Sequence, residues 1–123
     1  MSDIKSYKDL IIWKKSMELV RLIYELTNKF PQSEIYGLTS QMRRAAVAIP
    51  SNIAEGYGRR SSKEYLQFLS IAYGSSLELE TQIILSNDLK LVREIEVRNI
   101  LILLEEIKKM LYVLMFKIKQ KSI

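Results

Sequence analysis

The residues best suited to chemistry lie in the stretch IPSNIAEGYGRR, residues 49–60. Gly56-Tyr57-Gly58, followed by the start of a helix, could bind an anion through backbone N–H groups. A nucleotide-binding P-loop also requires a preceding strand and a Gly-Lys-Ser/Thr sequence, and this stretch has neither. Glu55 is a lone carboxylate near Asn52, which favours a hydrogen-bonded pair that fixes helix register over an active site. We therefore predict no catalytic residue and assign structural roles to Pro50, Asn52, Glu55 and Gly56.

Basic side chains surround this stretch. Arginine and lysine could bind a polyanion here, but an ordinary solvated surface carries the same charges, and both interpretations stay open. The net charge is +5, to which residues 1–60 contribute +4, residues 61–90 contribute −2 and residues 91–123 contribute +3. The candidate nucleic-acid contacts are Arg43, Arg44, Arg59, Arg60 and Lys63 around the joint between the second and third helices, together with Lys14, Lys15, Lys108 and Lys109 on outer helix faces.

The amino-acid composition excludes several classes of enzyme. The chain has no cysteine and no histidine, so thiolate or imidazole metal sites, disulfides and Ser-His-Asp catalysis are excluded. We predict no metal, no cofactor and no enzymatic activity. No uninterrupted apolar run is long enough to span a membrane, and the N-terminal sequence lacks the features of a signal peptide. The expected location is the cytoplasm.

Apolar residues recur at alternating steps of three and four through most of the chain, which predicts four amphipathic helices. The first follows Asp9 and ends near Lys29, before Pro31. The second begins between Ser33 and Thr39, and the fourth contains the strictest repeat, from Ile100 to Ile118. The third helix begins at a Ser61-x-x-Glu64 capping box and ends about Asn87-Asp88. The predicted fold is all-α, a single domain over residues 1–123, forming an up-down-up-down four-helix bundle.

Pro50 interrupts the second helical pattern, because proline has no amide hydrogen and its ring crowds the carbonyl of Ala46. The helix is therefore either kinked there or ends and restarts. The apolar repeat continues unbroken from Ile35 to Asn52, which favours one kinked helix. Gly56 and Gly58 are expected to supply the left-handed residue that ends it. Asn52 falls on the core side, so we expect Asn52 and Glu55 to be hydrogen-bonded to a neighbouring helix or to the following loop.

Three segments resemble a known bacterial family. They are LIIWKKSMELVRLIYELTNKFP, YGLTSQMRRAAVAIPSNIAEGYGR and EYLQFLSIAYGSSLELETQI, which together cover nearly the whole chain. The sequence is similar to four-helix-bundle proteins encoded inside intervening sequences of large-subunit ribosomal RNA genes, and to their relatives, the accessory variability determinant proteins of diversity-generating retroelements. The most specific part runs from Gln41 to Gly56, with a departure at Ala48, where many members have serine.

The resemblance implies a homopentameric ring without catalytic activity. For the retroelement relatives it also implies a basic surface that binds nucleic acid and a reverse transcriptase. Two hypotheses follow: an accessory protein that binds RNA or DNA, or an oligomeric scaffold that binds protein. The third helix carries a second apolar stripe beyond the one that a bundle core needs, which also favours a homo-oligomer. The chain has no sequence-reading motif and few aromatic residues expected at the surface, so binding is expected through phosphates.

Overall fold

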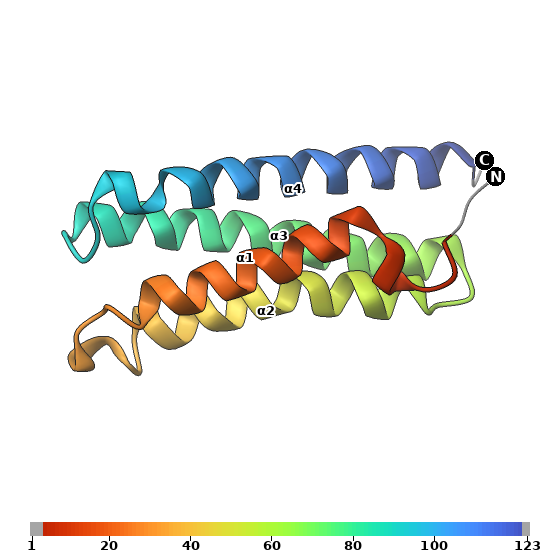
Figure 1. Cartoon of the computed structure of the whole chain (residues 1–123). Helices are drawn as coiled ribbons and strands as arrows, with labels where there is room; N and C mark the ends of the chain where they lie inside the picture. The colour runs from red at the N-terminus through yellow and green to blue at the C-terminus, as the bar shows by residue number, and fades with distance from the viewer. Residues whose placement is uncertain (1–3, 122–123) are drawn as a thin grey trace.

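The computed structural model describes residues 4–121, and their four long helices form one elongated bundle (Figure 1). The helices are α1 (Ile11–Thr27), α2 (Leu38–Tyr57), α3 (Ser62–Asp88) and α4 (Glu94–Lys121), with 3-10 turns η1 (Tyr7–Asp9) and η2 (Gln32–Glu34) before α1 and α2. Helix α1 packs against α2 and α4, and α3 packs against the same two helices. The expected all-α, up-down-up-down bundle is therefore confirmed.

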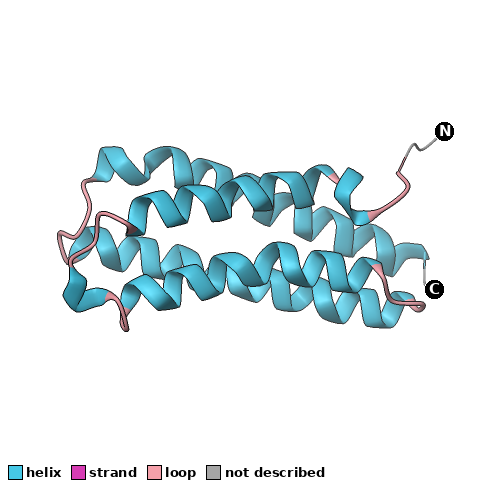
Figure 2. Cartoon of the chain, turned by 60° about the horizontal axis from the view of Figure 1, so that its bottom comes forward, coloured by secondary structure: helices cyan, strands magenta, loops and turns pink. Residues whose placement is uncertain are grey.

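Short loops join the helices at both ends of the bundle (Figure 2), and no strand occurs within residues 4–121. The α2–α3 loop lies at the same end as both chain termini, whereas the α1–α2 and α3–α4 loops lie at the opposite end (Figure 1). No helix in the described part of the chain is long and apolar enough to span a lipid bilayer.

The core is built from aliphatic side chains spaced one helical turn apart. Every helix contributes fully buried residues, among them Leu19, Ile23, Met42, Ile49, Ile53, Leu69, Leu79, Ile83, Leu104, Ile107 and Leu111. In α1 the buried stripe is Ile12, Ser16, Leu19, Ile23 and Leu26. A second apolar stripe of α1, which contains Trp13 and Met17, is only half-buried, because it lines a groove between α1 and α2.

Helix α2 continues through Pro50 without ending. The prediction of one continuous helix is therefore confirmed, and the alternative of two shorter helices is wrong. The kink itself stays a prediction. The helix begins at Leu38, inside the predicted window, after the η2 turn. Ile35 therefore lies before the helix and is exposed, not part of its core stripe.

The expected left-handed glycine at the end of α2 is wrong. Gly58, the C-cap, has φ −79°, and no glycine in the described chain has a positive φ. Gly56 is instead buried inside the last turn of the helix. A Cβ placed on Gly56 would lie 2.8 Å from the Cβ of Phe68, so glycine is required here by the close approach of α3.

The predicted start of α3 at Ser61 is confirmed. The Ser61 hydroxyl accepts a hydrogen bond from the Glu64 backbone amide at 3.2 Å, which satisfies a free donor of the first turn. The Glu64 carboxylate accepts from the Ser61 hydroxyl at 3.1 Å, a different return contact from the backbone one of a capping box. The end of α3 at Asp88 also agrees with the sequence prediction.

Candidate nucleic-acid interface

The two halves of the bundle differ strongly in charge. We define the terminal half as residues 4–18, 48–76 and 106–121, the ends of the helices near the chain termini, and the distal half as residues 19–47 and 77–105. The terminal half contains 12 Lys/Arg against 5 Asp/Glu, a net charge of +7. The distal half contains 7 against 8, a net charge of −1. All of the basic excess of residues 4–121 is therefore at one end of the molecule.

Several predicted contacts lie in the terminal half with their charges available. Arg60, Lys63, Lys14 and Lys109 are exposed, and none of them forms an ion pair with another residue of the described chain. Arg60 lies in the loop between α2 and α3, and Lys63 lies in the first turn of α3. Both can reach a polyanion without first breaking a contact within the protein.

Arg59 is held in place by its neighbours. Its guanidinium donates to Glu55 Oε2 at 2.8 Å and lies over the Phe68 ring, 4.6 Å from the ring centroid. This contact confirms the expectation that Glu55 bonds to the following loop. The pair is partly exposed, so Arg59 can still contribute positive potential at the α2–α3 loop.

Arg43 and Arg44 do not lie at the helix 2–3 joint, where the sequence analysis placed them. Arg44 precedes the end of α2 by 13 residues, which is about 20 Å along the helix axis. Arg43 donates to Thr27 Oγ1 at 2.9 Å and to Asn28 Oδ1 at 3.0 Å, and it stacks over Tyr24. Arg43 thus ties α2 to the end of α1, and only Arg44 is exposed.

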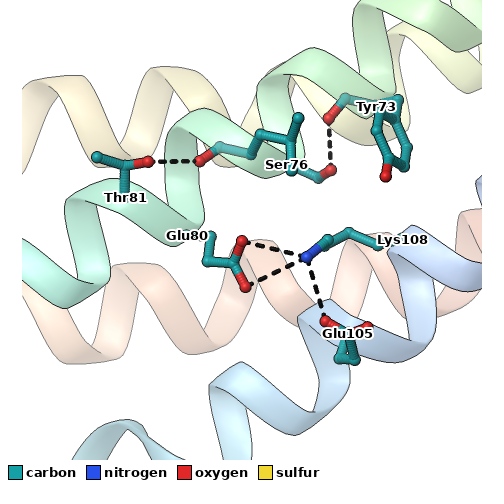
Figure 3. A network of polar contacts seen from close by, with 7 residues as sticks. Tyr73, Ser76, Glu80, Thr81, Glu105 and Lys108 are labelled. Atoms are coloured by element: carbon teal, nitrogen blue, oxygen red, sulfur yellow. Dashed lines mark hydrogen bonds and ion pairs between the residues drawn. The ribbon is translucent and has the colours of Figure 1, made fainter.

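Lys108 is occupied inside the protein. Its ammonium donates to both carboxylate oxygens of Glu80, at 3.1 and 3.2 Å, and to Glu105 at 3.1 Å (Figure 3). The Lys108 side chain is only 15% exposed. Burial would lower the pKa of Lys108, but the hydrogen bonds to Glu80 and Glu105 outweigh it and raise the pKa above its ordinary value. Lys108 therefore joins α3 to α4.

Lys15 also has a partner, because its ammonium lies 3.3 Å from Glu106 Oε2 on α4. This ion pair is partly exposed, so its net contribution to stability is small. Lys15 joins α1 to α4 near the middle of the bundle and keeps part of its charge accessible.

Sequence reasoning missed the basic residues that the fold brings to the same end of the bundle as Arg60 and Lys63 (Figure 1). These are Lys5 and Lys8 before α1, and Lys117, Lys119 and Lys121 at the end of α4, all exposed. The up-down-up-down topology already implied this arrangement, since it places the end of the fourth helix at the same end of the bundle as the joint of the second and third. The net charges of +4 for residues 1–60 and +3 for residues 91–123 could have indicated this concentration of basic residues.

Asn52 has a nearer partner than expected. Its side-chain amide donates to the carbonyl of Ala48 at 2.7 Å, one turn back on the same helix. The predicted hydrogen bond to a neighbouring helix or loop is therefore wrong for Asn52. A half-buried amide at the helix surface can satisfy its donor locally, without the help of another element.

A second surface, formed by α3 and α4, is apolar. Exposed side chains on α4 include Ile102 (56% exposed) and Tyr112 (63%), and Ile84 on α3 is 51% exposed. Ile84, Leu101 and Ile102 border one groove between α3 and α4, and Tyr73, Tyr112 and Val113 border another. Glu105 borders both grooves, Glu80 the first and Lys108 the second. Ion pairs join these three residues (Figure 3). We call this surface the α3/α4 face; it contains Leu77 and Ile84 of the predicted second stripe of α3.

Within residues 4–121, no group of three acidic, cysteine or histidine side chains is placed to hold a metal ion. Residues 8–113 match the family model described as 23S rRNA-intervening sequence protein. That span includes α1, α2 and α3 in full, α4 as far as Val113, and the motif from Gln41 to Gly56. No curated protein matches the chain.

Proposed function

The chain belongs to the 23S rRNA-intervening sequence protein family, and from this premise we propose that it is a non-enzymatic accessory protein that binds nucleic acid. In this proposal the lysines and arginines of the terminal half contact phosphates of RNA or DNA. The location proposed for this activity is the cytoplasm. The resemblance to retroelement accessory proteins adds a reverse transcriptase as a proposed protein partner.

The separation of charge between the two halves supports this proposal most directly. A net charge of +7 at one end and −1 at the other gives a directional field, which steers a polyanion toward the terminal half. Arg60, Lys63 and the lysines at the end of α4 are exposed there. Each phosphate that these side chains neutralise releases counterions, so affinity depends strongly on salt.

We further propose that the chain assembles into a closed homo-oligomer through the α3/α4 face, with five subunits as the family resemblance implies. Exposed apolar side chains on two adjacent helices are typical of a surface that is covered by another protein. A ring would repeat the basic end of each subunit, so that one polyanion contacts several copies and binds with higher avidity. The same apolar face favours the alternative function, an oligomeric scaffold that binds protein.

Charge reversal tests the nucleic-acid proposal. The double variant Arg60→Glu/Lys63→Glu removes two exposed cations from the terminal half. The control Arg21→Glu/Arg44→Glu makes the same change in charge on exposed, unpaired residues of the distal half within the described chain. We expect weaker RNA binding in the first variant and a salt slope reduced by about two, with little change in the control. Equal loss in both variants would contradict a terminal site, and no binding by the parent protein at about 50 mM salt would favour the scaffold.

The assembly is tested by placing charge on the α3/α4 face. Ile84→Glu/Ile102→Glu puts two carboxylates into the proposed contact, whereas Ile35→Glu/Tyr36→Glu changes two exposed apolar residues near η2. Light scattering should give a multiple of the 14.4 kDa chain mass for the parent and the control, and the monomer mass for the first variant. A monomeric parent at micromolar concentration would contradict the proposal.

A further inference from the structure

An aromatic pocket opens between the start of α1 and the middle of α2. Its volume is about 370 Å³, within the range of small-molecule sites. The lining includes Tyr7, Trp13, Met17, Val47, Pro50 and Ser51. The rings of Tyr7 and Trp13 meet edge to face, with centroids 5.3 Å apart. Pro50 therefore has a place in a surface pocket as well as in the packing of α2.

The pocket has polar groups available for a ligand. Among the described residues, neither the Trp13 indole N–H nor the Ser51 hydroxyl has a protein partner, so both can form hydrogen bonds with a bound molecule. Cations lie close by: the Lys8 ammonium is 6.0 Å from the Tyr7 ring centroid, and Lys14 follows Trp13 directly and is exposed. The pocket thus combines apolar rings, hydrogen-bonding groups and positive charge.

We propose that this pocket takes one unpaired nucleobase of a single-stranded nucleic acid, whose phosphates lie on the basic residues of the terminal half. This inference rests on the proposed function and adds the class of substrate. An aromatic ring stacks on any nucleobase, and cations beside it attract the neighbouring phosphates. A paired base is already stacked within its duplex and cannot enter without being flipped out. The preferred ligand is therefore a single strand, a loop or a bulge.

Stacking in the pocket also revises one expectation from the sequence, which was binding through phosphates alone. The partial exposure of Tyr7 and Trp13 could not be predicted from the sequence, because it depends on how η1 packs against α2. Base stacking contributes affinity that does not depend on reading sequence, so the expectation of little sequence preference is retained.

Trp13 makes the proposal directly testable, because it is the single tryptophan of the chain. The parent protein is titrated with a short single-stranded oligonucleotide and with an abasic strand of the same length and phosphate number, while Trp13 emission is followed. We expect both strands to bind at low salt through phosphates. Only the strand with bases should quench Trp13, and it should bind about fivefold to 150-fold more tightly per stacked base.

A variant separates the pocket from the rest of the surface. Tyr7→Leu removes one ring but keeps Trp13 as the reporter, and Tyr36→Leu removes an exposed ring near η2 as the control. We expect Tyr7→Leu to reduce the preference for the base-bearing strand over the abasic strand, and Tyr36→Leu to leave it unchanged. Circular dichroism confirms that both variants retain the helical content of the parent.

The outcomes distinguish this proposal from the broader one. Equal binding of the two strands without a change in Trp13 emission would overturn the nucleobase pocket and leave phosphate binding intact. Failure of both strands to bind would overturn both proposals. Trp13 emission that responds to protein concentration, but to neither strand, would assign the pocket to a contact between subunits and would also overturn the proposal.

Discussion

The Cα of Gly56 on α2 lies so close to α3 that an added Cβ would be 2.8 Å from the Cβ of Phe68. The same Cβ would lie 3.0 Å from a ring carbon of Tyr65 and 3.3 Å from its backbone oxygen. Neither the Phe68 Cβ nor the Tyr65 backbone can move away without shifting α3. The glycine thus sets the spacing of the two helices beside the loop that carries Arg59 and Arg60.

We expect Gly56→Ala to lower the free energy of unfolding by about 1–2 kcal/mol. Overpacking typically costs about 1–3 kcal/mol, and the better helix propensity of alanine returns up to about 1 kcal/mol of it. Gly74→Ala is the matched control, since an added Cβ there meets nothing within 4 Å. The control should be more stable than the parent by about 0.5–1 kcal/mol in urea unfolding. If Gly56→Ala were also more stable than the parent, α3 would have to shift at little energetic cost to accommodate the added Cβ.

The helices could be predicted from the sequence because their signals are local. A repeat of three and four residues marks each apolar stripe, and Ser61 with Glu64 marks the start of α3 within one turn. The Glu55–Arg59 pair is also one turn apart. Gly56 was misread because a glycine near a helix end is commonly a left-handed cap, whereas here the constraint comes from Phe68 on another helix.

The candidate site was only partly predictable, because its details depend on contacts between distant segments. Glu80 lies 28 residues before Lys108, and Thr27 lies 16 residues before Arg43, so nothing in the local sequence shows that these cations are occupied. The topology places Lys117 and Lys121 at the same end of the bundle as the α2–α3 loop. The sequence shows which residues are positively charged, but only the structure shows which of them are already paired within the protein.

Replacing Lys108 should affect stability more than binding. Lys108→Met leaves Glu80 and Glu105 without their shared cation, and we expect a loss of about 1–3 kcal/mol, between the values for exposed and buried ion pairs. Lys109→Met removes an exposed, unpaired cation of the described chain and should change stability by about 0.5 kcal/mol or less. Affinity for nucleic acid should fall more in the Lys109 variant. A larger loss of affinity in the Lys108 variant would indicate instead that Lys108 contacts the nucleic acid.

The contribution of Lys108 should also depend on alkaline pH. The folded protein raises the pKa of Lys108 above its ordinary value, so its stabilising contribution is fully present below the unfolded pKa of about 10.4. That contribution is lost as the pH rises through the folded pKa. The stability difference between parent and Lys108→Met should therefore persist at about pH 10 and decrease only at higher pH. A difference that disappears near neutral pH would contradict the ion-pair explanation.

Asn52→Ala should lower the free energy of unfolding by less than the loss of a buried inter-helix hydrogen bond would. The Asn52 amide donates to the Ala48 carbonyl of its own helix, at 2.7 Å, so the substitution removes one local hydrogen bond. Such a bond contributes about 0.5–1.5 kcal/mol, and the higher helix propensity of alanine offsets part of it. We expect a loss below about 1 kcal/mol in urea unfolding. A loss of several kcal/mol would indicate that Asn52 fixes the packing of α2 against its neighbours.

Acid pH should loosen the wall of the aromatic pocket before the bundle unfolds. The backbone N–H groups of Lys5 and Ser6 donate to the Asp9 carboxylate, and they lower its pKa below the ordinary value. Because its pKa is lowered, the Asp9 carboxylate stabilises the η1 turn above the unfolded pKa of about 3.9. This stabilisation is lost as the pH falls through the folded pKa. The η1 turn carries Tyr7, whose ring contacts Trp13, so its loosening should change Trp13 emission.

We therefore expect a step in Trp13 emission below about pH 4, which Asp9→Asn should lack. Glu96→Gln is the matched control, because Glu96 also has a lowered pKa, caused first by the Arg93 backbone amide, but lies in the distal half. The Glu96→Gln protein should show the same step in Trp13 emission as the parent. Circular dichroism recorded in parallel separates this local change from loss of the helices. An emission step that coincides with helix loss in all three proteins would show that η1 does not loosen separately from the bundle.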